Sequence, residues 1–446
     1  MRSYVPNTEA ERADMLRAIG LADMDALFAD IPEQVRLNRP LELPRGMSES
    51  EVRRAFAQLA GRNETGRPIF RGAGAYDHYI PAAVPQLAMR AEFYTAYTPY
   101  QAEMSQGMLQ AIFEFQSHIC ALTGLDAANA SVYDGATAAV EAMNMLVAAR
   151  RKNKVLISTG LHPDVAAVLK TYARFSKIEL VTIPLDENGL TDISFIEQNA
   201  ENAAGLIAAQ PNFFGCLEDM KTLADATHAF GGLFVSYAYP HSLGVLARPG
   251  DLGADIAVGD GQSLGLPLSY GGPYVGFMAA TQKLMRNLPG RIAGETADKD
   301  GNRAFVLTLQ AREQHIRREK ASSNICSNQM LCALTVGIYL SLMGPKGLRE
   351  AANQSMQKAH YLAEGMSHIK GIRLRYPNTP FFNEFAVDYG KDSSLVNALL
   401  KDRGIMGGVR LNRLVPGDPG ALWCATEQNA REEIDGVLNA LEEVFK

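Results

Sequence analysis

The sequence has few cysteines, and none are paired at the spacing that a disulfide framework or a structural zinc site uses. Its five cysteines are scattered and odd in number, and no CxxC spacing occurs among Cys120, Cys216, Cys326, Cys332 and Cys424. This pattern argues against both kinds of cross-link and fits a reducing compartment. We therefore predict a cytoplasmic protein without a metal site.

Long apolar runs and an excess of one charge are also lacking. The chain begins Met1-Arg2-Ser3-Tyr4, without the apolar core of a signal peptide. The longest apolar run, 332–343, is interrupted by polar residues and is too short to span a bilayer, so we expect a buried helix there. The net charge of −6 gives no electrostatic attraction for nucleic acid or an anionic membrane. Neither partner is expected.

Three parts are predicted along the chain: an N-terminal helical and extended arm over 1–65, a large α/β domain over 66–344 and a small α+β domain over 345–446. Thr8 opens one helix of the arm, and Ser48 with Glu51 forms a capping box for another. The motif Gly344-Pro345 marks the second boundary.

The large domain shows short apolar runs separated by helical stretches. The runs 155–158, 180–183, 205–208 and 233–236 recur about every 25 residues, with helices expected between them, as at 163–175 and 217–230. Strand and helix alternating at this spacing favour a mainly parallel central sheet with flanking helices. Runs 255–258 and 274–278 add strands, and the polar stretch 294–303 is expected to be an exposed loop.

Four segments carry side chains suited to chemistry. The first, 94–107, combines tyrosines, a carboxylate and amides just before an expected helix at 108–122. It suits the wall of a pocket, or equally a packed surface turn. The second, 129–142, places glycine at a helix start, where backbone amides can bind an anion. Asp134 can instead simply cap that helix.

The third segment, 236–273, ends in a glycine-rich turn between two strands, where ligands of α/β sheets tend to bind, although a plain connecting loop is the alternative. No lysine occurs between Lys221 and Lys283. The fourth segment, 311–329, holds four cationic side chains and His315 close together, which suits either an anion site or a solvated helix face. No HExxH, phosphate-binding P-loop or GxGxxG motif occurs.

Taken together, several motifs resemble the glycine decarboxylase family, the P-protein of the glycine cleavage system. The resemblance covers nearly the whole chain. Its most specific parts are Tyr97–Gly107, Thr123–Ser131 leading into Thr137–Ala142, and Ser323–Cys326, with Tyr76–Pro81 and Ile31–Arg36 in support.

The resemblance implies the fold of fold-type I pyridoxal-phosphate (PLP) transferases. In this family the enzyme is either one fused chain or two homologous subunits of about this length, and one half carries the Schiff-base lysine. The lysine position falls at Gln262 or Ser263 in this sequence, and the aspartate that would pair with the pyridine nitrogen falls at Ser236. Lys283 is not expected to substitute. The chain is therefore similar to the half whose own cofactor site is vestigial.

The family reaction decarboxylates glycine on PLP and passes the aminomethyl carbon to the lipoyl arm of the H-protein. The resemblance implies that PLP is carried by a homologous second subunit, in an α2β2 assembly, and that this chain completes the partner's active site. The residues expected to do so are Tyr97, Thr98, Tyr100, Gln101, Glu103, Ser105 and Gln106, with His78 and Tyr79 as further candidates. Two alternatives stay open: a scaffold that only stabilises its partner, and a lone enzyme that uses another cofactor.

Overall fold

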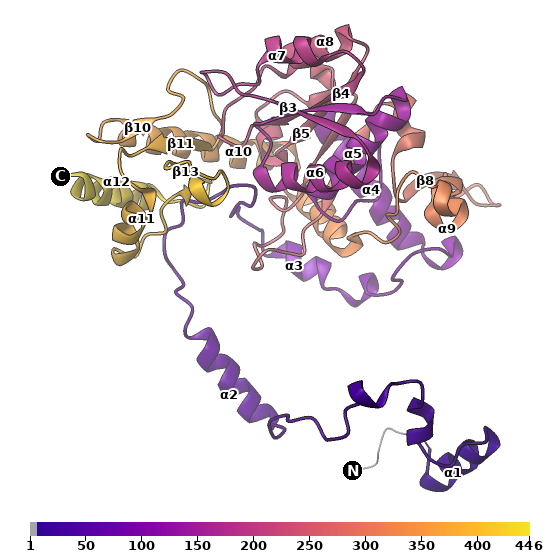
Figure 1. Cartoon of the computed structure of the whole chain (residues 1–446). Helices are drawn as coiled ribbons and strands as arrows, with labels where there is room; N and C mark the ends of the chain where they lie inside the picture. The colour runs from indigo at the N-terminus through magenta and orange to yellow at the C-terminus, as the bar shows by residue number, and fades with distance from the viewer. Residues whose placement is uncertain (1–6) are drawn as a thin grey trace. The chain divides into compact units, whose positions relative to one another are not determined.

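The structure, a computed structural model, describes residues 7–446. The chain forms two compact units, Met1–Thr65 and Gly66–Lys446, and each is described by itself. Most of the helices and several of the strands are labelled in Figure 1.

The first unit consists of two helices and extended chain. α1 (Glu9–Ala18) starts at a capping box of Thr8 and Glu11, and α2 (Glu49–Ala60) at one of Ser48 and Glu51, which confirms both predicted starts. None of the described residues of this unit is buried. Its helices therefore have no core of their own to cover their apolar side chains.

A seven-stranded sheet forms the centre of the second unit, in the order β1-β7-β6-β5-β4-β2-β3. The strands are β1 (Ala127–Ala128), β2 (Lys154–Ser158), β3 (Glu179–Ile183), β4 (Ala203–Gln210), β5 (Leu233–Ala238), β6 (Ile256–Asp260) and β7 (Gly276–Ala280). The pairs from β3 to β6 are parallel, and β7 pairs antiparallel with β6 and β1. The predicted α/β class and mainly parallel sheet are confirmed.

Helices cover both faces of this sheet, because neighbouring strand residues point to opposite sides. Val155 and Ile157 of β2 pack with α5 (Gly135–Arg150) and α6 (Pro163–Ser176) on one face. Leu156, between them, packs on the other face. The helices of that second face are α4 (Gln106–Thr123), α7 (Ile193–Asn199), α8 (Met220–Ala229) and the first part of α10.

The long helix α10 (Met330–Ser367) is kinked at Gly344, whose φ of 58° lies outside the helical range and which precedes Pro345. By length and composition alone this helix is able to cross a membrane. Val336 and Tyr339 are nevertheless buried in the core against α4 and the sheet, as predicted for this run. A short helix, α3 (Ala83–Ala88), lies against it.

A four-stranded antiparallel sheet lies near the C-terminus, in the order β10-β11-β13-β12. Its strands are β10 (Arg373–Leu374), β11 (Glu384–Asp388), β12 (Val409–Arg410) and β13 (Ala421–Cys424), and its helices are α11 (Ser393–Asp402) and α12 (Arg431–Phe445). Trp423 is fully buried between this sheet and its helices. The secondary structure expected here is confirmed, while a domain boundary at residue 344 stays a prediction.

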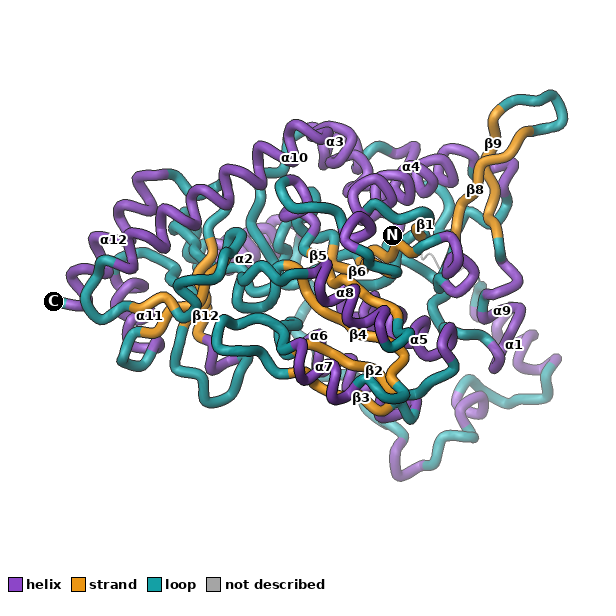
Figure 2. The backbone as a smooth tube through the Cα atoms, turned by 90° about the horizontal axis from the view of Figure 1, so that it is seen from above, coloured by secondary structure: helices purple, strands orange, loops and turns teal. Residues whose placement is uncertain are grey.

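The polar stretch 294–303 was expected to be an exposed loop, and this expectation is wrong for half of its length: 294–297 and 303 belong to strands, while 298–302 form an exposed turn. β8 (Ile292–Ala297) and β9 (Arg303–Thr308) form a hairpin that projects from the body (Figure 2). An ion pair of 2.8 Å joins Glu295 to Arg303 across it. The strands are polar because their outer part is solvent-exposed, so no alternation of apolar residues marks them. A short helix, α9 (Gln314–Arg317), follows.

Candidate functional site

A cavity of about 410 Å³ lies at the carboxyl ends of the parallel strands. Tyr237 and Tyr239 enter it from the end of β5, and Asp260 from the end of β6. The segment 73–76 and Glu384 of β11 close the other side. This edge is where open α/β sheets place their ligands, so the cavity, called the cleft below, is the first candidate site.

Two carboxylates accept hydrogen bonds from backbone amides at the start of α5, beside the cleft. Asp134 Oδ1 accepts a hydrogen bond of 2.7 Å from the Thr137 amide, which confirms the capping interpretation. Asp260 accepts bonds from the amides of Gly135, at 3.0 Å, and Gln262, at 2.9 Å. Burial raises the pKa of Asp260 to about 6, against the lowering effect of these two bonds. The helix start therefore already holds an internal anion.

The start of α5 is also sterically tight. A Cβ atom on Gly135 would lie 2.4 Å from the Tyr237 hydroxyl and 2.9 Å from the Asp260 amide nitrogen. Side-chain atoms thus occupy the space next to the amides that an external phosphate would need.

Gln262, one of the two positions expected for the lysine, is fully engaged within the chain. Its Oε1 accepts a bond of 2.8 Å from the Tyr76 amide, and its Nε2 donates to the carbonyls of Tyr76 and Leu266. Ser263, the other position, lines the cleft and has no partner for its hydroxyl. Ser236 is buried and also unpartnered, but its side chain does not line the cleft.

PLP does not fit the residues of this cleft. An aldehyde cofactor needs an amine to bind covalently and a phosphate site, and neither is present: the lining includes no lysine or arginine among the described residues, and Asp260 occupies the helix start. Four carboxylates line it instead, those of Asp134, Asp164, Asp260 and Glu384.

Ser263 stands in a Gly-x-Ser-x-Gly sequence, 261–265, the spacing of a serine-hydrolase nucleophile. Its hydroxyl lacks a hydrogen bond to any base, and it is only 3% exposed. The pattern therefore carries no hydrolase chemistry here.

A buried polar network runs from the cleft toward α10. Tyr76 donates to Glu384 at 2.6 Å, and its ring stacks on Tyr239 at 4.1 Å. Tyr239 in turn contacts His78, whose Nδ1 lies 2.7 Å from Glu427. Burial raises the pKa of Glu384 to about 7, although bonds from Tyr76 and Ala73 favour its charged form. His78 is thus part of the protein interior, while Tyr79 is exposed and only its amide bonds to Glu427.

The predicted segment 94–107 does not reach the cleft and lies on a different, open surface. Tyr97 is 85% exposed and donates to Ser327 at 3.0 Å. Tyr100 is 54% exposed, and its hydroxyl accepts a bond of 2.8 Å from Arg291. Gln101 and Glu103 are exposed and Thr98 is half-buried. These side chains therefore present polar atoms outward.

Two residues of this segment face inward instead. Ser105 is buried at the start of α4. The Gln106 amide exchanges two bonds of 2.8 Å with the backbone of Phe305 in β9 and donates to the Ala102 carbonyl. Gln106 thus fixes the loop to the hairpin. The part of both residues in a partner's site stays a prediction.

The structure brings the first and fourth predicted segments together. A surface cavity of about 490 Å³ is lined by Glu313, His315, Arg318 and Cys326, among others. The His315 ring meets Tyr100 edge-on, with 6.4 Å between ring centroids. Arg318 has a φ of 53° and a ψ of −125°, a strained conformation for a residue with a side chain. We call the exposed part of 97–103, together with this cavity, the open surface.

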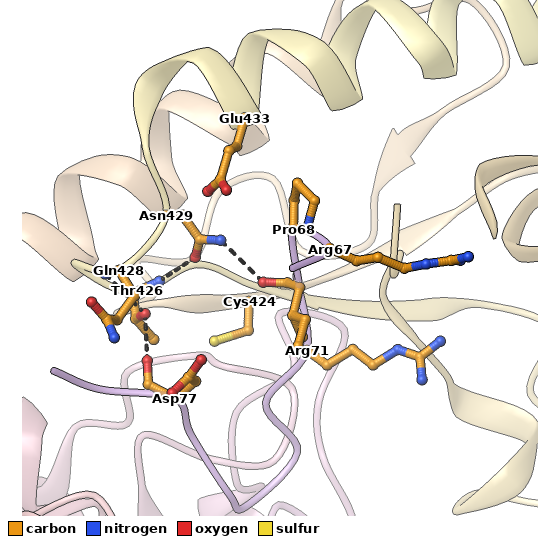
Figure 3. Close-up of a pocket in the computed structure, with 10 residues that line it drawn as sticks. Arg67, Pro68, Arg71, Asp77, Cys424, Thr426, Gln428, Asn429 and Glu433 are labelled. Carbon is orange, nitrogen blue, oxygen red and sulfur yellow. Dashed lines mark hydrogen bonds between the residues drawn. The ribbon is translucent and has the colours of Figure 1, made fainter. Parts of the chain in front are cut away.

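A smaller cavity of about 200 Å³ lies between the segment 67–77 and the C-terminal sheet. Figure 3 shows that hydrogen bonds of Thr426 and Asn429 join the two walls. Asn429 donates to the Ile69 carbonyl at 3.0 Å, and Thr426 to that of Asp77 at 2.7 Å. These bonds hold 67–77 against β13, so we assign this cavity a structural role.

Sequence reasoning missed several cleft residues. Asp260 lies in the glycine-rich turn that was singled out, beside the predicted positions Gln262 and Ser263, so the end of β6 was a usable signal for it. Tyr76 lies in a motif that was quoted for the resemblance alone. Glu384 reaches the cleft from 308 residues away, and no local pattern marks it.

Comparison with known proteins decides the family. A family model described as "Glycine cleavage system P-protein" matches residues 2–441. The chain belongs to this P-protein family. It is 51% identical to the probable glycine dehydrogenase (decarboxylating) subunit 1 of Moorella thermoacetica, over 98% of this chain and 99% of that protein. The subunit 1 of Carboxydothermus hydrogenoformans is 50% identical, over 98% and 99%.

Solved structures agree with the P-protein assignment. An inhibitor-bound crystal structure of glycine decarboxylase (P-protein) superposes with a TM-score of 0.89 at 45% identity, covering 99% of this chain and 100% of that one. A NifS-like protein superposes with a TM-score of 0.63 at 14% identity, covering 85% of this chain and 99% of that one, which shows the shared fold alone. The expected family and fold are confirmed.

Proposed function

We propose that the chain is the first subunit of a two-subunit glycine dehydrogenase (decarboxylating), and that it acts without a cofactor of its own. The observation that carries the proposal is the cleft: Asp260 bonds to the start of α5, and the lining contains no lysine among the described residues. The names of relatives that share about half of its residues support the same function.

The cofactor and partners follow from this proposal. PLP is carried by a homologous second subunit in an α2β2 assembly, where it supplies the electron sink for loss of CO2 from glycine. The lipoyl arm of the H-protein accepts the aminomethyl group. The assembly works in the cytoplasm and binds neither nucleic acid nor membrane.

The open surface is the part of the chain that we assign to the partner's active site. Tyr97, Thr98, Tyr100, Gln101 and Glu103 offer hydroxyl, amide and carboxylate groups there. Gln106 anchors the loop to β9, and Ser105 is buried beside it. The further candidates His78 and Tyr79 lie in another segment, where Tyr79 is exposed and His78 is buried against Glu427.

Arg291 orients the side chain of Tyr100. Its guanidinium lies 5.0 Å from the centre of the Tyr100 ring and donates to the phenol oxygen. With this oxygen accepting from Arg291, the phenol hydrogen remains available to an acceptor outside the chain. Tyr100 is thus placed to donate a hydrogen bond to a group in the partner's site and to exclude water from it.

Substitution of Tyr100 tests this role. In the reconstituted complex, Tyr100→Phe and Tyr100→Ala should lower glycine–CO2 exchange by roughly tenfold or more, because a hydrogen bond made in the active site is lost. Co-elution of the two subunits should not change. Tyr172→Ala is the matched control, because Tyr172 is a comparably exposed tyrosine on α6. Unchanged exchange in both Tyr100 variants would remove the assignment.

One observation favours the alternative of a pure scaffold. Residues 7–65, the described part of the first unit, expose fourteen large apolar side chains, more than an isolated segment of this length keeps in water. A scaffold predicts that variants of the open surface alter only assembly. Deletion of residues 1–65 with loss of assembly, alongside full exchange in the Tyr100 variants, would favour it.

A further inference from the structure

The vestigial cleft keeps a volume of about 410 Å³ although the groups that would hold PLP are gone. Its remaining lining has a definite chemical character. Three features of that lining point to the same class of ligand.

The first feature is the sign of the charge. Asp134 and Asp260 lie at the start of α5 and Asp164 on α6, and no lysine or arginine of the described residues joins them in the lining. Glu384 of β11 also lines the cleft, but burial raises its pKa to about 7, so it adds a full charge only at higher pH. His162, the remaining basic side chain, has a pKa lowered mainly by burial, so it stays neutral near pH 7. The cleft therefore attracts cations and repels anions.

The second feature is the aromatic wall. Tyr76, Tyr237, Tyr239 and Tyr274 line the cleft together with Phe213. Aromatic rings combined with carboxylates form the usual environment of bound organic ammonium groups. In residues 7–446 no group of three or more histidine, cysteine, aspartate or glutamate side chains is arranged to hold a metal ion. The aromatic wall thus favours an organic ammonium ion over a metal ion.

The third feature is an unused hydrogen-bonding group. Ser263 lines the cleft, is 3% exposed and has no partner for its hydroxyl in the described structure. An unsatisfied buried hydroxyl costs free energy, and a bound N–H donor would satisfy it. The charge sets the sign of the ligand, and Ser263 provides a contact for one of its N–H groups.

From these features we infer that the cleft is a binding site for a small organic ammonium ion that carries no carboxylate. A carboxylate on the ligand would find no cationic partner in the lining, whereas an ammonium group meets Ser263 and the carboxylates at the start of α5. The site belongs to this chain alone and does not depend on the function proposed for the open surface.

A matched pair of probes tests the charge. Methylammonium and acetate are similar in size and opposite in charge, and each has a methyl signal for saturation-transfer NMR. The isolated full chain is titrated with methylammonium chloride at constant ionic strength and, separately, with sodium acetate. Binding of inorganic phosphate, which has no methyl group, is followed by its 31P signal. We expect saturable binding of methylammonium and none of acetate or phosphate.

Variants then locate the site. Asp134→Asn keeps the helix cap but removes a charge, and should weaken methylammonium binding roughly tenfold. Ser263→Ala should weaken it about threefold or more by removing the free hydroxyl. Asp219→Asn is the control, because Asp219 caps α8 through the same kind of bond outside the cleft. Circular dichroism of each variant checks that the fold is intact.

Three results would overturn the inference: no saturable methylammonium binding, binding of phosphate or acetate with equal strength, or methylammonium binding that both Asp134→Asn and Ser263→Ala leave unchanged. Because the assay uses the chain without its partner and without glycine exchange, its failure is distinguishable from a failure of the proposed function.

Discussion

The cleft and the open surface both concentrate polar and aromatic side chains, but they use them in opposite ways. In the cleft, the side chains of Gln262 and Asp260 form hydrogen bonds with the chain's own backbone. On the open surface, Tyr97 and Tyr100 are largely exposed, and Glu103 points into solvent. The position where the fold usually holds a cofactor is therefore closed to PLP, while a peripheral loop offers its groups outward.

This difference teaches that a lost cofactor site need not mean a lost role in catalysis. The missing lysine alone would leave the phosphate site open, but Asp260 and Tyr237 fill the start of α5 as well. The cleft therefore lacks both the amine and the open helix start that PLP needs. The open surface presents hydroxyl, amide and carboxylate groups outward, as the role proposed for it in a partner's active site requires.

The largest expected effect comes from the buried carboxylate of the cleft. Because the pKa of Glu384 is about 7 in the folded protein against an ordinary 4.5, the folded state holds a proton that the unfolded chain releases. This contribution to stability is complete below pH 4.5 and is lost as the pH rises through 7. The difference between the two pKa values corresponds to about 3 kcal/mol of the free energy of unfolding.

Glu384→Gln tests this pH dependence. Between pH 4.5 and 8, the free energy of unfolding of the wild-type protein, measured with urea, should fall relative to that of the variant by this amount. Parallel curves for the two proteins would show that burial does not hold Glu384 protonated.

Two glycines near helix starts give the next largest contrast. Gly135→Ala should destabilise the protein by about 1–3 kcal/mol, because the new methyl group meets Tyr237 and Asp260. Gly107→Ala, in the first turn of α4, meets no atom within 4 Å and should be neutral or stabilising by up to about 1 kcal/mol. Thermal unfolding of both variants checks the pair. Equal melting temperatures would contradict the tight packing at the start of α5.

The smallest effect is expected beneath the open surface. Gln106→Ala removes bonds to the backbone of Phe305 and should cost about 1–2 kcal/mol of stability. Gln110→Ala is the control, since Gln110 is exposed and bonds only to Glu114 one turn away. Hydrogen exchange of the β8–β9 hairpin should speed up only in the first variant. If both variants behave alike, Gln106 does not anchor the loop.

Local patterns were enough to predict most of the fold. Apolar runs in β2 to β6 and the capping boxes at Thr8 and Ser48 were readable because strand burial and helix capping act over a few residues. The kink at Gly344 was marked by the glycine and proline themselves. The β8–β9 hairpin was not predicted, because its outer half is exposed and its residues therefore show no apolar alternation.

The cleft could be predicted only in part. The absence of lysine at Gln262 and Ser263 is a property of the sequence, read through the family resemblance. The bond between Gly135 and Asp260 joins residues 125 positions apart, and the contact of Tyr76 with Glu384 spans 308. Long-range pairs of this kind depend on the finished fold. The exposure of Tyr97 and Tyr100 likewise depends on packing that no local pattern reveals.

The central claim is that this chain does not hold PLP in its own cleft. The most direct test is to incubate the two-subunit complex with PLP, reduce it with borohydride and map the pyridoxyl label by mass spectrometry. We predict a stoichiometric label on one lysine of the partner subunit and no stoichiometric label on this chain. A stoichiometric pyridoxyl group on any lysine of this chain would contradict the account.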